Sequence, residues 1–272
     1  MTYSGLEWGR SDAPLVIALH GWLDNALSFS VLAPQLTGLR VLALDLSGQG
    51  WSAHRSQDAT YHIWDDIPQL IGILEQVGEP SVDVLGHSRG AAIAVLLAAA
   101  LGERCAHLVL LDGLLPYPIS EASLPEQFIR AQRDKRDDKK YRSRTFSHID
   151  EFVAARRKLG FSDESARLLA PRALRASADG ALLELTHDPR LNHASAIKLT
   201  SGMCDALYAS VTAKVLLLVA AQGLFLRLGA EAAERAVNAM VDCELKRVPG
   251  GHHTHMEARS GEVAAHINQF LK

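Results

Sequence analysis

The sequence predicts an α/β protein in which helices cover both faces of a mostly parallel central sheet. Short, continuously apolar segments recur along the chain, as expected for strands that are buried on both faces. Segments with apolar residues at helical spacing lie between them and indicate amphipathic helices. Because strands and helices alternate, right-handed crossovers and a parallel sheet are favoured.

Six segments rich in Leu and β-branched residues are predicted to be strands, and the first four are bounded by Gly, Pro or Asp. They cover residues 15–19, 41–46, 82–86, 107–112, 214–221 and, with a weaker pattern, 243–248. Apolar residues at intervals of three or four positions predict helices between them. These helices cover residues 63–77, the segment after Gly90, and residues 263–271.

The alternation is interrupted between residues 116 and 212, where amphipathic segments such as 148–160 and 194–211 occur but no convincing strand appears. We therefore expect residues 116–212 to form a helical lid, or cap. It is inserted between late strands of a core that consists of residues 1–115 and 213–272. Within the lid, residues 133–144 mix both signs of charge, which predicts a solvated helix face.

Composition and charge exclude several classes of function. The 272 residues include 28 Lys and Arg against 31 Asp and Glu, and a net charge of −3 gives no reason to expect a nucleic-acid partner. The longest apolar run, 91–102, is shorter than the roughly 20 residues that span a membrane, so no membrane span is expected. No secretory signal is apparent, and three cysteines without a Cys-x-x-Cys pair favour reduced thiols in the cytoplasm.

The segment GHSRG at residues 86–90 is the most informative motif. It follows a predicted strand and precedes a helix that is rich in small residues. In that position, G-x-S-x-G is typical of a nucleophile elbow, in which glycines allow a sharp turn that presents the serine, here Ser88, at the carboxyl edge of the sheet. The alternative is an ordinary strand-to-helix turn, because Gly and Ser are common turn residues. The strand before the motif and the small-residue helix after it favour the elbow.

A serine nucleophile needs a base, and the base needs an orienting partner. In this fold order, the base lies on a loop after the last strand, where residues 249–255 read PGGHHTH. His252 is our candidate because it directly follows glycine and precedes Glu257, while His255 is the fallback and His253 a further competitor. These histidines could also suggest a metal site, but no HExxH motif or acidic cluster accompanies them, so no metal is expected.

An oxyanion hole requires two backbone N–H donors. Arg89, directly after the serine, is predicted to supply one of them. The loop after the strand 15–19 begins with His20, and Trp22 of this loop is predicted to supply the second donor. His20 is expected to brace the loop and not to titrate in catalysis.

With these motifs, nearly the whole chain resembles the α/β-hydrolase superfamily, in its branch with a serine nucleophile. HGW at 20–22 resembles the oxyanion loop of the family, DLSGQGWS at 45–52 its D-x-x-G-x-G-x-S loop, and GHSRG at 86–90 its elbow. The predicted insertion corresponds to the lid domain. The segment DPRL at 188–191 is similar to one in serine hydrolase-like proteins.

The acid departs from the usual family pattern. Many members carry an aspartate just after the strand that follows the lid, but residues 220–229 contain no carboxylate. A known variation places the acid after the preceding strand, where this chain has Asp112. The resemblance therefore implies Asp112, although an aspartate here could simply cap the following turn. Weaker candidates are Asp45, which belongs to a loop-shaping motif, Asp188 at the lid junction, and Glu257.

The expected function is hydrolysis of a carboxylic ester with no organic cofactor or metal. Ser88 forms the acyl-enzyme, His252 transfers the proton, Asp112 orients His252, and the N–H groups of Trp22 and Arg89 stabilise the oxyanion. Water is the final acyl acceptor. The Leu, Phe and Ala content of the lid favours small to medium apolar or aryl esters, but packing of the lid on the core explains that content equally well.

Several alternatives stay open. A serine at position 88 disfavours haloalkane and epoxide hydrolysis, which in this superfamily depend on an aspartate nucleophile. Hydrolysis of a thioester or of a carbon–carbon bond is compatible with the same residues. The missing acid after the lid motivates a second class, a ligand-binding member of the fold without catalysis. The Arg89 side chain is open to contact with a substrate carboxylate or to a solvent-facing or helix-packing role.

Overall fold

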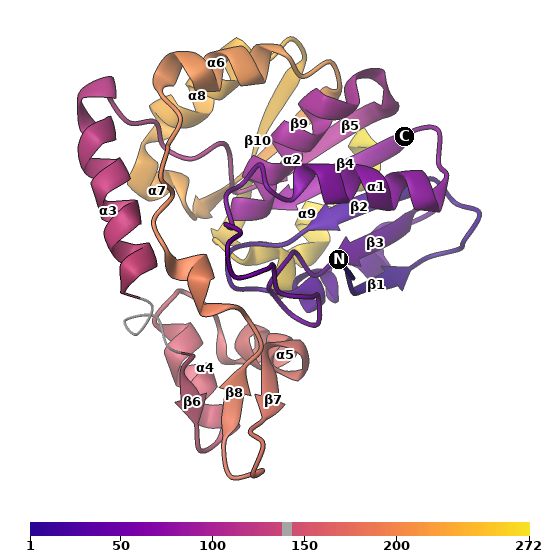
Figure 1. Ribbon diagram of the computed structural model, residues 1–272. Coiled ribbons are helices and arrows are strands. Elements are labelled where there is room, and N and C mark those ends of the chain that lie inside the picture. The colour runs from indigo at the N-terminus through magenta and orange to yellow at the C-terminus, as the bar shows by residue number, and fades with distance from the viewer. Residues whose placement is uncertain (138–142) are drawn as a thin grey trace.

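The computed structural model describes residues 1–137 and 143–272. Among these residues, the central sheet contains seven strands in the order β1-β3-β2-β4-β5-β9-β10 (Figure 1). All neighbouring pairs are parallel except β1 with β3. The strands are β1 (Gly5–Trp8), β2 (Leu15–Leu19), β3 (Arg40–Leu44), β4 (Val82–His87), β5 (Cys105–Leu111), β9 (Lys214–Gln222) and β10 (Cys243–Gly251). The predicted α/β class and all six predicted strands are confirmed.

The edge strand β1 was not predicted. Its four residues, GLEW, pair with β3 in antiparallel register, with Gly5 opposite Leu44. Gly5, Leu6 and Trp8 are only partly buried, and Glu7 is exposed. A short edge strand of this kind lacks the continuous apolar run that identified the buried strands.

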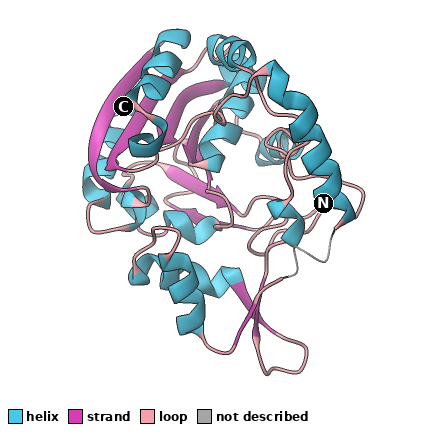
Figure 2. Cartoon of the chain, turned by 90° about the vertical axis from the view of Figure 1, so that its left-hand side faces the viewer, coloured by secondary structure: helices cyan, strands magenta, loops and turns pink. Residues whose placement is uncertain are grey.

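Helices cover both faces of the sheet (Figures 1 and 2). Alternate residues of β2 show the two layers, because Ile17 packs in one hydrophobic cluster with α2 while Val16 packs in a second cluster with α9. The first layer contains α1 (Ile67–Val77), α2 (Arg89–Leu101), α6 (Ser201–Ala209) and α8 (Ala230–Ala239), and the second contains α9 (Ser260–Phe270). No helix in the described parts of the chain is both long and apolar enough to cross a bilayer.

The segment between β5 and β9 is not purely helical, so that part of the prediction is wrong. It contains α3 (Leu124–Arg136), α4 (Ile149–Arg157), α5 (Asp163–Ala173) and α6, and a small antiparallel sheet that projects at the bottom of Figure 1. The strands of this sheet are β6 (Thr145–Phe146), β7 (Leu174–Ala176) and β8 (Leu183–Leu185). Strands of two or three residues are too short to show an alternating pattern.

The charged segment 133–144 fits its prediction only in part. Residues 138–142 lie outside the described residues. At the end of α3, Asp134 is only 4% exposed, and it accepts a hydrogen bond from the backbone N–H of Ala194 at 2.9 Å. This carboxylate therefore connects α3 to the segment before α6 and does not belong to a solvated helix face.

A buried ion pair connects α5 to the core. Arg172 of α5 donates from Nη2 and Nε to Asp45 Oδ2 at 2.6 and 3.0 Å, and its guanidinium lies 4.1 Å from the ring centroid of Trp51. Asp45 also accepts from the backbone N–H groups of Ala26 and Trp51. The side chains of Arg172 and Asp45 are 5% and 0% exposed, so each charge depends on its partner.

Replacing Arg172 by Met is expected to lower the free energy of unfolding by about 3–5 kcal/mol, because it leaves the Asp45 carboxylate buried without its counter-charge. Urea denaturation followed by circular dichroism measures this change. The matched control is Arg157→Met, which removes an exposed ion pair with Asp163 and should cost less than about 1 kcal/mol. Equal stability of the two variants would contradict the assignment.

Candidate active site

Three of the predicted site residues directly follow strands of the sheet. Ser88 follows β4, Asp112 follows β5, and His252 follows β10. Their strands lie in the consecutive order β4-β5-β9-β10, and each neighbouring pair is parallel. Because the carboxyl ends of parallel strands meet at one edge, the fold brings these side chains together from positions far apart in the sequence.

The turn at Ser88 has the backbone of a strained elbow. Ser88 has φ 53° and ψ −116°, a conformation that a residue with a side chain rarely adopts. A Cβ at Gly86 would lie 2.5 Å from the carbonyl oxygen of Gly90, and a Cβ at Gly90 would lie 2.0 Å from that of Leu19. Both flanking positions therefore need glycine, as the G-x-S-x-G pattern predicts.

His252 lies between the serine and the aspartate. Its Nε2 is 2.9 Å from Ser88 Oγ, and its Nδ1 is 2.6 Å from Asp112 Oδ2. Since an ionised carboxylate only accepts, Nδ1 carries the proton and Nε2 is free to accept from the serine hydroxyl. The fallback residue lies elsewhere, because His255 Nε2 pairs with Ser28 Oγ at 3.0 Å.

Asp112 binds His252 and also the carboxyl end of β9 with the turn that follows it. It has φ 41°, and its carboxylate accepts from the backbone N–H groups of Ala220 and Leu224 at 3.0 and 2.7 Å. A Cβ at Gly223 would lie 2.2 Å from Asp112 Oδ2. The carboxylate from β5 thus occupies the space that a side chain at position 223 would need.

The weaker candidates for the acid have other contacts. Asp45 pairs with Arg172, as described above, and Asp188 accepts from the Tyr61 hydroxyl and from Arg190. Glu257 is partly exposed, and burial raises its pKa. Of the predicted acids, the structure brings only Asp112 into contact with His252.

The residue before the serine was not singled out in the sequence. His87 is completely buried, and its Nε2–H donates to the backbone carbonyl of His252 at 2.9 Å. It therefore fixes the chain at the proposed base. Its ring also packs against three histidine rings at centroid distances of 4.7 Å to His252, 5.4 Å to His253 and 4.2 Å to His255.

The loop predicted to hold the oxyanion donor is fixed by buried polar contacts. His20 Nε2 accepts from the N–H of Leu46 at 3.0 Å, so its Nδ1–H donates to the carbonyl of Gly21 at 2.8 Å. Burial lowers the pKa of His20, which agrees with the predicted bracing role. Gln49, which the sequence did not single out, accepts from the N–H of Leu23 at 2.7 Å, and Leu23 has φ 59°.

This loop lies against the helix that begins after Ser88. The close approach of Gly90 to the carbonyls of Leu19 and His20 places the start of the loop beside the first turn of α2. Trp22 has a 44% exposed side chain, and its ring N–H donates to the carbonyl of Leu191 at 3.2 Å. The backbone segments that carry the two predicted donors are therefore neighbours.

The side chain of Arg89 points toward the chain between β3 and α1. Its Nη2 donates to the carbonyl of Tyr61 at 3.1 Å and lies 3.9 Å from Asp66 Oδ2. Only 13% of this side chain is exposed. These contacts hold the side chain against the segment before α1 and argue against recognition of a substrate carboxylate.

The buried histidines predict a loss of stability in acid. Desolvation lowers the pKa of His253 to about 4 and also lowers the pKa of His87 and His255. The unfolded chain binds these protons near pH 6.5, so stability is fully present above about pH 6.5 and is lost as the pH falls toward 4. His253 alone accounts for up to about 3 kcal/mol.

Urea denaturation at about pH 7.5, 6 and 5 measures this slope. His253→Gln should flatten it, whereas His148→Gln, at an exposed position, should leave it unchanged. A free energy of unfolding that stays constant between about pH 7 and 5 would contradict this account.

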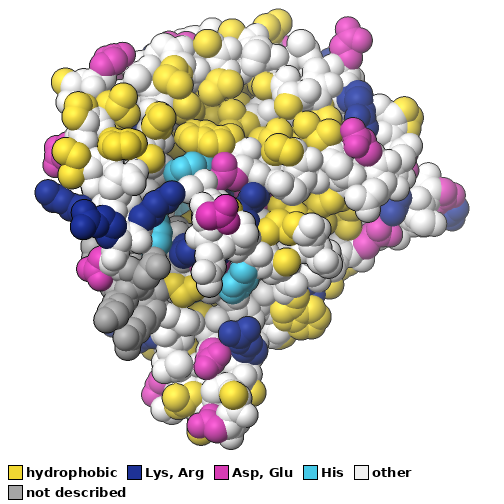
Figure 3. Space-filling view, viewed as in Figure 1, with side chains coloured by type: hydrophobic (Ala, Val, Ile, Leu, Met, Phe, Trp, Pro, Cys, Tyr) yellow, Lys and Arg dark blue, Asp and Glu magenta, His cyan; other side chains and the backbone are white. Residues whose placement is uncertain are grey.

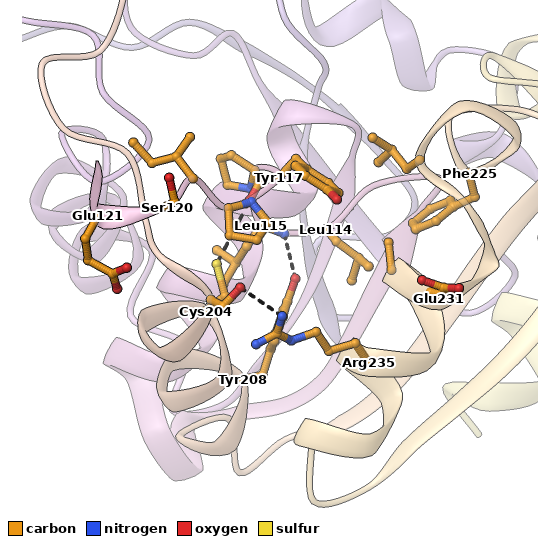
Figure 4. Close-up of a pocket in the computed structure, with 16 residues that line it drawn as sticks. Leu114, Leu115, Tyr117, Ser120, Glu121, Cys204, Tyr208, Phe225, Glu231 and Arg235 are labelled. Carbon is orange, nitrogen blue, oxygen red and sulfur yellow. Dashed lines mark hydrogen bonds between the residues drawn. The ribbon is translucent and has the colours of Figure 1, made fainter. Parts of the chain in front are cut away.

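A cavity of about 470 Å³ lies beside the chain that follows Asp112 (Figure 4). A Cβ at Gly113 would lie 2.6 Å from the carbonyl oxygen of Ser88, so this segment passes directly against the serine before it reaches the cavity. The cavity combines apolar side chains with a few polar ones. Figure 4 labels Leu114, Leu115, Tyr117, Ser120, Glu121, Cys204, Tyr208, Phe225, Glu231 and Arg235.

Comparisons with known proteins agree with the class that the fold and the site define, an α/β hydrolase. Residues 14–241 match the model of the family described as alpha/beta hydrolase fold. The chain therefore belongs to the α/β-hydrolase fold family. Among curated proteins, it is similar to the serine hydrolase-like protein of Danio rerio, with 30% identity over 98% of this chain and 84% of that protein.

Two further similarities extend over nearly the whole chain. Serine hydrolase-like protein 2 of Homo sapiens is 28% identical over 97% of this chain and 89% of that protein. The crystal structure of a hypothetical protein from Pseudomonas aeruginosa PAO1 superposes with a TM-score of 0.91 and 36% identity, and covers 99% of this chain and 95% of that one. The similarities to the two serine hydrolase-like proteins support the predicted serine hydrolase-like branch of the superfamily.

Proposed function

We propose that this chain is a serine esterase that hydrolyses carboxylic esters through an acyl-enzyme on Ser88. The observation that carries the proposal is the continuous contact from Ser88 Oγ to His252 Nε2 at 2.9 Å and from His252 Nδ1 to Asp112 Oδ2 at 2.6 Å. A serine, an imidazole and a carboxylate in this order are the elements of a nucleophilic triad. The same contact argues against the alternative of a ligand-binding protein, because that alternative was motivated by the missing acid.

In the proposed mechanism, Ser88 Oγ attacks the ester carbonyl while His252 Nε2 accepts the hydroxyl proton. The N–H groups of Trp22 and Arg89 stabilise the tetrahedral oxyanion, each by about 3 kcal/mol. Collapse breaks the bond to the alcohol, which leaves with the proton from His252. A water molecule, deprotonated by His252, then releases the carboxylic acid, and Asp112 holds the imidazole in one tautomer throughout.

The cavity next to Gly113 supports small to medium apolar or aryl esters as substrates. Leu114, Leu115 and Phe225 provide apolar walls, and a volume of about 470 Å³ is in the usual range for a small-molecule site. On the face seen in Figure 3, hydrophobic side chains gather in the upper half, over α6 and α8. Two large hydrophobic residues, Tyr117 and Leu226, are 65% and 74% exposed to solvent.

A reducing compartment, the cytoplasm, is part of the proposal. Cys105, Cys204 and Cys243 are all free thiols in the structure. Burial raises the pKa of Cys105 to about 12 and that of Cys243 to about 11, so both side chains remain protonated thiols at neutral pH. These thiols need no oxidising environment for the fold.

A fluorophosphonate probe tests the proposed nucleophile directly. We expect folded protein to be labelled on Ser88, heat-denatured protein to remain unlabelled, and the variant His252→Ala to react much more slowly because it lacks the base. Peptide mass spectrometry locates the label. Folded protein that does not react would support the ligand-binding alternative.

A panel of aryl esters with increasing acyl length tests the substrate class. We expect kcat/KM to rise with acyl length until the cavity is filled and then to fall. The corresponding thioesters form the comparison series. A consistent preference for thioesters at every acyl length would replace the carboxylic ester by a thioester in this proposal.

A further inference from the structure

Three buried side chains form a compact polar group beside the proposed triad. In the part of the chain that the structure describes, Asp24, His87 and His253 are the one group of histidine, cysteine and acidic residues whose ligand atoms all lie within 4.8 Å of one another. Their exposed fractions are 4%, 0% and 5%. Acidic and histidine clusters are common on solvated surfaces, but this group lies in the interior and is formed by three separate segments of the chain.

The two imidazoles of this group each have an unused nitrogen. His87 donates its Nε2–H to the carbonyl of His252, so its Nδ1 carries a lone pair. Within the described residues, neither His87 Nδ1 nor His253 Nδ1 has a hydrogen-bond partner. Since a buried polar atom without a partner is destabilising, the unused nitrogens point to a ligand that binds them.

The carboxylate of Asp24 completes the group. It forms an ion pair with Arg156 through Oδ1, which leaves Oδ2 for another partner. A Cβ at Gly21 would lie 3.1 Å from His87 Nδ1 and 3.2 Å from Asp24 Oδ2, so both atoms border the same small space beside Gly21. Arg156 orients the carboxylate in the way that outer partners orient ligands in metal sites.

We propose that Asp24, His87 and His253 bind a divalent transition-metal ion such as Zn²⁺, and that this ion inhibits the enzyme. Two imidazole nitrogens and one carboxylate oxygen suit Zn²⁺, and three protein ligands leave the fourth position to water. In a tetrahedral site with bond lengths of 2.0–2.1 Å, ligand atoms lie roughly 3.4 Å apart, so the side chains must move inward around the ion.

The inhibition rests on the proposed function, whereas the binding does not. The ring centroid of His252 lies 4.7 Å from that of His87 and 4.9 Å from that of His253. A dication held by these two rings disfavours the imidazolium that must form on His252 during acyl transfer. One bound equivalent is therefore expected to lower ester turnover at least about tenfold.

Access to the site requires a local movement. The ring of Phe161 stacks on that of His253 at a centroid distance of 3.6 Å. The guanidinium of Arg156 lies over the Phe161 ring, 4.2 Å from its centroid. Because all three ligands are buried, the ion can enter only when this cover opens. Inhibition by Zn²⁺ is therefore expected to develop with time and to be reversed by a chelator.

Calorimetric titration of chelator-treated, full-length protein with Zn²⁺ tests the binding without using turnover. Wild type and Ser88→Ala should each bind one equivalent with equal affinity. His253→Gln and Asp24→Asn should weaken binding at least about 100-fold. The matched control is His148→Gln, which removes an exposed histidine that pairs with Asp150 at 3.0 Å and should leave the affinity unchanged.

Anomalous diffraction at the zinc edge from a Zn²⁺-soaked wild-type crystal locates the ion even if a variant fails to fold. An ion between Asp24, His87 and His253 supports the proposal. No binding, or an ion held by His252 or by surface residues only, overturns it. If Zn²⁺ binds at the site while the chelator-treated, metal-free protein hydrolyses no ester, the proposed function fails and the metal site remains.

Discussion

Replacing Ser88 by Ala is expected to lower ester turnover by about 10⁶-fold, with the fold unchanged. The hydroxyl that this variant removes is the one that lies 2.9 Å from His252 Nε2, and no acyl-enzyme can form without it. The strained backbone at this position, with φ 53°, is not made worse by the change from Ser to Ala. Steady-state turnover of an aryl ester and circular dichroism of the variant measure the two effects separately.

Ser28 provides a matched control for this variant. Its hydroxyl also pairs with a buried histidine of the same loop, His255, at 3.0 Å, but it does not contact His252. Ser28→Ala should therefore reduce turnover less than about tenfold and still react with a fluorophosphonate. If Ser88→Ala retained more than about one per cent of wild-type turnover, Ser88 would not be the nucleophile.

Most of the central sheet could be predicted because its inner strands are buried on both faces. Strand β2 and residues 215–221 of β9 are continuous apolar runs, and a run of this kind is visible in the sequence without any knowledge of its neighbours. The edge strand β1 and the short strands β6 to β8 have no such run. Their pairing is determined by segments that lie elsewhere in the chain, which a local pattern does not contain.

The main residues of the candidate site could be predicted because short local motifs mark their positions. The elbow at 86–90 requires glycines at fixed positions, and the loop after the last strand holds few residues that could act as a base. Asp112 was predicted because the resemblance to the α/β-hydrolase superfamily implies an acid after the strand that precedes the lid. Its contacts with Ala220 and Leu224 depend on chain more than 100 residues away.

Contacts between distant segments explain what the sequence did not reveal. His87 supports His252 across 165 positions, and Gln49 shapes the backbone at Leu23 across 26 positions. In the sequence, only three neighbouring histidines of one loop were considered as metal ligands, and no metal was expected. In the structure, His253 instead faces Asp24 and His87, which no spacing rule connects to it.

Asp112→Asn is expected to lower kcat by about 10⁴-fold. Asn keeps the size of the side chain but replaces one carboxylate oxygen by an amide, which cannot stabilise the imidazolium or hold the N–H tautomer at His252 Nδ1. Turnover of an aryl ester measures the loss. A loss of less than about tenfold would return Asp112 to a turn-capping role, because its hydrogen bonds to Ala220 and Leu224 would then be its main contribution.

Moving the carboxylate to the other side of the same space provides a second test of this acid. A side chain at position 223 would enter the volume of the Asp112 carboxylate, since a Cβ there would lie 2.2 Å from Oδ2. Gly223→Asp alone is therefore expected to destabilise the fold. Combined with Asp112→Ala, the same change should raise turnover at least about tenfold above that of Asp112→Ala alone, because the new carboxylate can reach His252 Nδ1.

The control for this exchange is Gln222→Asp in the Asp112→Ala background. Gln222 is the last residue of β9 and is exposed, so a carboxylate at this position faces solvent and should recover no activity. If both exchanges restored turnover equally, general negative charge near the site would be sufficient. Recovery from position 223 alone would mean that the His252 imidazole needs a carboxylate at one specific place. A residue that follows either β5 or β9 can supply this carboxylate.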